Sequence, residues 1–148
     1  MILSYEDIEE ARKLANDLKL EGASLLSSTP MALIQKICNG IGPSWFPEVI
    51  RDAITKLHKC LKVVWMIHDL QYYEGDGTTH CFKKANDNFR ENGRIVADYF
   101  YKWYDPRRYR ERRSAKKFAA LCHAFGGIAY KNAIKERQQE EANASVGI

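Results

Sequence analysis

The segment VVWMIHDLQYYEGDGTT (residues 63–79) decides the fold of this chain. Its apolar spacing continues a helical pattern that begins near Pro47 and ends near Tyr73. The sequence Gly-Asp-Gly at 75–77 ends that helix, and Thr78 or Thr79 can cap a following helix that runs to about Tyr101. Such a tight turn predicts that residues 47–73 and 79–101 form an antiparallel helical hairpin at the centre of the fold.

The flanking segments also show helical patterns. We expect a helix from about Tyr5 to Leu20, which Ser4 and Asp7 can cap, and a short helix from Thr29-Pro30 that stops at the break in residues 39–43. A fifth, basic and amphipathic helix is expected at about 106–139, with a frayed tail at 141–148. No strand-like alternation is present, so the sequence predicts a mostly α, single helical domain over residues 1–140 with its motif core at 38–92.

Composition limits the cellular setting. Four cysteines, Cys38, Cys60, Cys81 and Cys122, are scattered singly in 148 residues, and we expect them to be reduced. The first residues lack the basic start and apolar run of a signal peptide, and no stretch approaches the ~20 apolar residues of a membrane span. These features predict a protein that is made in the cytoplasm.

The positive charge is concentrated in one segment. The net charge of the chain is +4, but between Lys102 and Lys117 there are eight basic and two acidic residues. Together with the apolar residues that follow, this segment has the composition of an interfacial helix on anionic lipid. It predicts an anionic partner, a membrane surface or, less favoured, nucleic acid. A solvated helix face with no partner is the alternative.

The hairpin brings two chemically useful residues to one level. His68 lies six residues before Glu74, about 9 Å from the turn, and Asp87 lies eight residues after Thr79, about 12 Å along the other arm. We therefore expect Asp87 to hold the imidazole in one tautomer, as a histidine general base requires. Tyr72, four residues after His68, lies on the same face and can donate its hydroxyl to Asp87.

Asp69 is a carboxylate within an apolar run and needs a counter-charge. Calcium suits it, because this hard cation is bound by carboxylates together with backbone carbonyls. The glycine-bearing segment CNGIG (residues 38–42) can turn several carbonyls toward one point. An ordinary turn between helices is the alternative for this segment.

Residues 38–92 resemble the calcium-dependent phospholipase A2 superfamily, in particular its short viral and bacterial members without disulfides. The resemblance rests on CNGIG at 38–42, HDLQY at 68–72 and ANDNF at 85–89. It implies that His68 activates a water to attack a phospholipid ester, that Asp87 orients His68, and that Tyr72 steadies Asp87. It also implies that Ca²⁺ is held by Asp69 and by the carbonyls of Cys38, Gly40 and Gly42, and that the Gly40 N–H helps to stabilise the oxyanion.

The chain departs from the secreted enzymes of that superfamily at three points. Val64 replaces a half-cystine, Pro43 follows the glycine segment directly, and the 26 residues from Gly42 to His68 make a longer connection. A site with one carboxylate binds calcium weakly, so we expect an enzyme of this kind to act after lysis, to be carried in a virion or to be injected into another cell.

Two other functions compete with the hydrolase. The first is a non-catalytic relative that serves as a virion or protein-binding module. The second is a metal-dependent phosphohydrolase that uses His58, His68, Asp69 and Asp87; the ten residues between the two histidines, about 15 Å of helix, argue against it.

Overall fold

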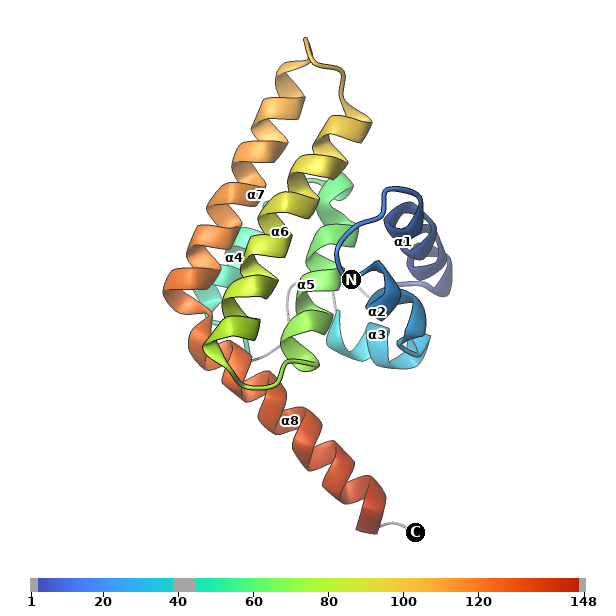
Figure 1. Ribbon diagram of the computed structural model, residues 1–148, viewed down its shortest axis with the longest axis vertical. Coiled ribbons are helices and arrows are strands. Elements are labelled where there is room, and N and C mark those ends of the chain that lie inside the picture. The colour runs from blue at the N-terminus through green and yellow to red at the C-terminus, as the bar shows by residue number, and fades with distance from the viewer. Residues whose placement is uncertain (1–2, 39–44, 147–148) are drawn as a thin grey trace.

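The computed structural model describes residues 3–38 and 45–146, and these form an all-helical domain (Figure 1). Its elements are α1 (Tyr5–Asp17), α2 (Ala23–Ser28), α3 (Met31–Ile37), α4 (Glu48–Thr55), the 3-10 turn η1 (Lys59–Leu61), α5 (Lys62–Tyr73), α6 (Thr79–Phe100), α7 (Pro106–Phe125) and α8 (Gly127–Val146). The described residues contain no strand, so the expected mostly α class is confirmed. None of these helices is long and apolar enough to cross a bilayer.

The central element is α5, which is apolar around most of its circumference. All of its residues from Val63 to Leu70 are buried, as are Tyr72 and Tyr73. A helix that is apolar on every side must be covered on every side. In Figure 1, α1 to α3 lie on one side of α5, with α6 and α7 on the other and α8 crossing below.

The expected long helix at 47–73 is wrong, because the chain breaks between α4 and η1. Hydrogen bonds of the tighter 3-10 type end α4, from Leu57 N–H to the Ile54 carbonyl and from Lys56 N–H to that of Ala53. His58 then adopts an extended backbone, and its ring bonds to Arg110 of α7 at 2.8 Å. The break thus coincides with a tertiary contact, and neither glycine nor proline marks it in the sequence. The arms that run antiparallel across the turn at 74–78 are α5 and α6.

The expected helix at 106–139 is two helices. The first, α7, ends at Phe125. The second, α8, begins at Gly127 and continues to Val146, through most of the tail for which fraying is expected. A Cβ at Gly126 would lie 2.7 Å from the Tyr72 hydroxyl and 2.5 Å from the Cys122 carbonyl oxygen. Only glycine allows the chain to turn this close to α5.

The local signals at helix starts are confirmed. Ser4 and Asp7 form a capping box at α1, the Thr78 side chain caps α6, and Asp105 with Pro106 starts α7. The short helix α2 was not expected, and all four cysteines are free.

The most extensive helix pair is α6 with α7, and a close approach between Gly93 and Ala115 sets their separation. A Cβ built at Gly93 would lie 2.3 Å from the Ala115 Cβ. We expect Gly93→Ala to lower the free energy of unfolding by about 1–3 kcal/mol, because the helices must move apart. Urea denaturation measures this loss. Gly127→Ala is the matched control, since a Cβ there meets nothing within 4 Å and the helix gains at most about 1 kcal/mol.

Candidate functional site

His68 lies in the core, and its ring is fixed by a hydrogen bond from α6. The ring Nε2 lies 2.8 Å from Asn86 Oδ1, and the Tyr72 hydroxyl donates to the same oxygen at 2.7 Å. Aromatic rings surround the imidazole, with that of Tyr72 at 4.2 Å, Phe89 at 5.5 Å and Phe118 at 5.6 Å between centroids. Only 1% of the His68 surface is exposed.

The expected pairing of His68 and Tyr72 with Asp87 is wrong. The side chain of Asp87 is 73% exposed, and its contact is with His123 of α7, at 3.3 Å. Asn86 occupies the position expected for Asp87. One residue along a helix changes the height by only about 1.5 Å but turns the side chain by about 100°, so equal height did not fix direction.

A chain of polar contacts leads from this buried amide to the surface. Asn86 Nδ2 lies 3.4 Å from His123 Nδ1, and His123 Nε2 lies 3.3 Å from Asp87 Oδ1. The donors and acceptors agree if Asn86 Nδ2 donates to His123, and its Oδ1 accepts from His68 Nε2–H and from Tyr72. The proton on Nε2 leaves Nδ1 as the ring nitrogen that can act as a base.

Asp69 is a buried carboxylate without a hydrogen bond among the described residues. Both of its oxygens are buried without a hydrogen-bond partner in residues 3–38 and 45–146, and so is His68 Nδ1. The two groups adjoin, with 3.9 Å between His68 Nδ1 and Asp69 Oδ1. Burial raises the pKa of Asp69 to about 6. Burial opposes protonation of His68, but the neighbouring Cys122 and Asp69 raise its pKa overall.

Of the other expected calcium ligands, the structure describes only Cys38, which follows α3. Its thiol is buried and donates to the Met66 carbonyl at 3.6 Å, and both burial and the charge of Asp69 raise its pKa. The predicted role of its carbonyl stays a prediction. Gly40 and Gly42 lie outside the described residues, and their predicted roles stay predictions.

An open groove borders the buried histidine. It has a volume of about 370 Å³ and lies between α4 and α7, with Val49, Ala53, Leu57 and Leu121 among its lining residues. Phe118 also lines it, and the Phe118 ring lies edge-to-face with that of His68, with 5.6 Å between the centroids. Phe118 therefore separates the imidazole from this groove.

Sequence reasoning missed Asn86 and His123. A signal for Asn86 was present, because the buried residues of α6 include Ala85, Phe89, Asn92 and Val96, and Asn86 falls within this stripe while Asp87 falls outside it. His123 has no such signal, since its contact depends on how α7 packs against α6. His58, the fourth residue of the phosphohydrolase hypothesis, contacts Arg110 and Glu111 instead of His68.

No group of three or more His, Cys, Asp or Glu side chains is arranged to hold a metal ion within residues 3–38 and 45–146. A cation at Asp69 would therefore depend on backbone carbonyls and water. No protein-family model, curated protein or solved structure matches the chain.

The role of Asn86 in the core can be tested apart from any activity. Asn86→Leu keeps the branched outline of the side chain but removes the shared acceptor, so the buried His68 Nε2–H and Tyr72 hydroxyl lose their partner. We expect a loss of about 2–4 kcal/mol in the free energy of unfolding, measured by urea denaturation. Asp87→Leu is the neighbouring exposed control and should change it by less than about 0.5 kcal/mol. A larger loss in the Asp87 variant would contradict the observed pairing.

The buried carboxylate predicts a pH dependence of stability in the absence of divalent cations. The pKa of Asp69 is about 6 in the folded chain, above its ordinary value of 3.8 in an unfolded chain, so folding favours its protonated form. Stability from this group is therefore complete below about pH 4 and is lost as the pH rises through 6. Relative to Asp69→Asn, the wild type should lose about 2–3 kcal/mol between pH 4 and pH 7.5 in EDTA. Equal pH profiles for the two proteins would contradict this prediction.

Proposed function

We propose that this protein hydrolyses a phospholipid ester with the help of calcium, in the manner of the phospholipase A2 enzymes that its motifs resemble. One observation carries the proposal. A buried carboxylate, Asp69, and a buried imidazole nitrogen, His68 Nδ1, lie 3.9 Å apart, and neither has a hydrogen-bond partner among the described residues. Leaving such groups unpaired in a core costs free energy, so the arrangement calls for a ligand.

Each side chain then has a distinct task. Asn86 holds the Nε2–H of His68 and so keeps the Nδ1 lone pair available to take a proton from an attacking water. Tyr72 fixes the same amide oxygen and limits its rotation. An amide stabilises the imidazolium less than a carboxylate does, so the proposed base is weaker than the His68–Asp87 pair expected from the sequence.

Calcium fits the charge of the site. Asp69 would hold it together with the carbonyl of Cys38 and, as the sequence predicts, those of Gly40 and Gly42. When bound, calcium supplies a positive charge to stabilise the oxyanion that forms from the ester carbonyl. Its charge also offsets that of Asp69, which otherwise favours a protonated His68. The neutral imidazole is the form that can accept a proton.

A non-catalytic binding module is the second candidate. Burial of His68 favours it, because with 1% of its surface exposed the ring needs a movement of its neighbours, such as Phe118 beside the groove, before a substrate can reach it. In this interpretation the hydrogen bonds of His68 and Tyr72 to Asn86 serve only to hold α5 against α6.

The deciding experiment is fatty-acid release from mixed phosphatidylglycerol and phosphatidylcholine vesicles, with excess calcium or with chelator. We expect release that depends on calcium and falls by about 10²–10⁴-fold in His68→Ala. Asp69→Asn should lose both activity and the rise in melting temperature that calcium gives the wild type. Asp87→Asn, which changes an exposed carboxylate one residue from Asn86, is the control and should retain activity.

Folded wild type that releases no more fatty acid than His68→Ala would overturn the hydrolase and leave the binding module. Release that persists in chelator would overturn the role of calcium.

A further inference from the structure

A second unusual surface lies at the far end of the α6–α7 pair, where the chain turns between the two helices. We call residues 99–109 the apex. Figure 1 shows that it projects beyond the rest of the molecule. Five large aromatic side chains are exposed there: Tyr99 (61%), Phe100 (47%), Trp103 (72%), Tyr104 (62%) and Tyr109 (48%). Exposed apolar groups that gather at one place indicate a binding surface more often than the same groups scattered singly.

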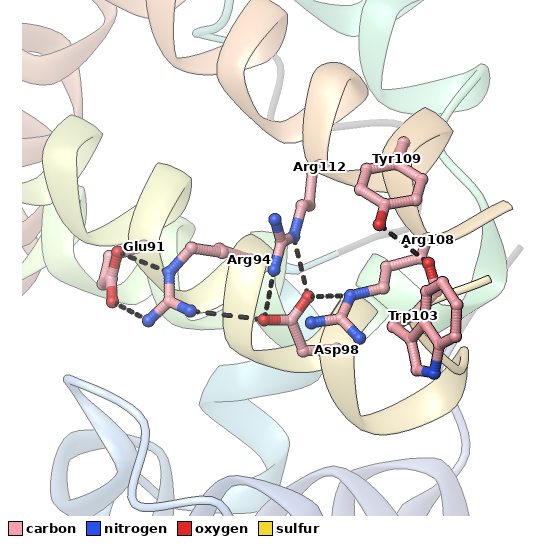
Figure 2. Close-up of polar contacts among 7 residues, drawn as sticks. All are labelled: Glu91, Arg94, Asp98, Trp103, Arg108, Tyr109 and Arg112. Carbon is pink, nitrogen blue, oxygen red and sulfur yellow. Dashed lines mark hydrogen bonds and ion pairs between the residues drawn. The ribbon is translucent and has the colours of Figure 1, made fainter. Parts of the chain in front are cut away.

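The apex is held in shape by polar contacts, which Figure 2 shows. Asp98 at the end of α6 accepts hydrogen bonds from Arg94, Arg108 and Arg112, with distances of 3.2, 2.8 and 2.6 Å for the shortest contact of each. The Tyr109 hydroxyl donates to the Trp103 carbonyl at 2.7 Å. The aromatic side chains are thus presented on a fixed turn, and a partner need not bear the entropy cost of ordering it.

The apex and the helix ends beside it carry an excess of positive charge after their internal ion pairs are counted. Residues 94–113 contain seven basic and three acidic side chains. Each carboxylate is already paired: Asp98 with three arginines, Asp105 with Arg107, and Glu111 with Arg110. Lys102 and Arg107 lie over the rings of Tyr104 and Tyr101, at 5.9 and 4.8 Å from their centroids. Cations and aromatic rings therefore share one surface, which favours an anionic partner.

The shape of the apex selects among anionic partners. Single-stranded nucleic acid is usually bound along a groove that follows its backbone, whereas this surface is a projecting turn. A bilayer surface yields around such a turn. Tryptophan and tyrosine rings lie at the level of the lipid headgroups, and lysine and arginine extend to the phosphates. We propose that the apex docks on an anionic phospholipid bilayer, with Trp103 and Tyr104 in its interfacial layer.

This membrane contact differs from the interfacial helix expected from the sequence. Phe118, the first apolar residue after the basic segment, is 1% exposed and packs on His68. Phe125 and Ile128 are exposed, but they lie at the opposite end of α7 and on α8, away from the aromatic residues of the apex. The proposed membrane contact therefore uses the turn before α7. Asn86 precedes Phe100 by fourteen residues on α6, about 21 Å of helix, so the apex is separate from the candidate site and the inference does not rest on its chemistry.

The test is flotation of the full chain with vesicles of equal phosphatidylcholine and phosphatidylglycerol, in EDTA and low salt. We expect the wild type to bind these mixed vesicles and to bind phosphatidylcholine vesicles only weakly. Binding to the mixed vesicles should fall about tenfold or more in Trp103→Ser/Tyr104→Ser. Lys102→Ala should weaken binding about fivefold. Ile128→Ser is the matched control, because Ile128 is 73% exposed on α8 and lies outside the apex.

Vesicle binding that is equal in the double variant and the control would overturn the proposal, as would binding that ignores phosphatidylglycerol. The melting temperature of the double variant should match that of the wild type, since both side chains are exposed.

A labelled single-stranded or duplex oligonucleotide that binds more tightly than vesicles, and loses binding in the double variant, would overturn the bilayer in favour of nucleic acid. Since EDTA is present and the assay can be repeated in His68→Ala, its outcome is independent of hydrolysis.

Discussion

The Asn86 carboxamide is the polar contact on which the arrangement of the core depends. Its oxygen accepts from His68 and Tyr72 of α5, and its nitrogen faces His123 of α7, so one side chain of α6 relates three helices. His68, Tyr72 and Asn86 are all buried. In such a place an unpaired donor costs free energy, and a hydrogen bond is stronger than in water. Rotation of α5 about its axis would break both bonds at once. The amide therefore fixes which nitrogen of His68 is held and which is left for chemistry.

Asp69 shows the opposite treatment of a buried polar group. Its neighbour His68 is held through Nε2, yet its own two oxygens have no partner among the described residues. A folded protein can tolerate the free-energy cost of such a group because burial of apolar side chains elsewhere offsets it. Here α5, which is buried along almost its whole length, supplies much of that burial. Buried carboxylates without hydrogen bonds are common at sites that bind an ion or perform acid–base chemistry. The contrast between Asn86 and Asp69 is the physical basis for placing a site here.

The features that could be predicted from the sequence are those that residues close together in the chain determine. The starts of α1, α6 and α7 follow from side chains that cap their own helix, so they could be located without tertiary information. The breaks at His58 and Gly126 depend on contacts with Arg110 and Tyr72, which lie 52 and 54 residues away. The same limit applies to the site. The level of Asp87 along its helix follows from residue spacing. The direction of its side chain depends instead on which stripe of α6 is buried, and Asp87 lies outside that stripe.

The basic segment illustrates how a fold changes the meaning of a charge run. Most of its arginines form ion pairs within the molecule. Of the other cations, Lys102 lies over the Tyr104 ring at the apex, whereas Lys116 and Lys117 lie farther along α7. Because Gly93 and Ala115 hold α6 firmly against α7, the apex and the candidate site lie at a fixed separation along one rigid pair of helices. If both proposals hold, a molecule standing upright on its apex keeps His68 about 20 Å from the headgroups. Hydrolysis of the same bilayer then requires the helix pair to tilt toward the surface, so docking and catalysis would be successive orientations of one anchored molecule.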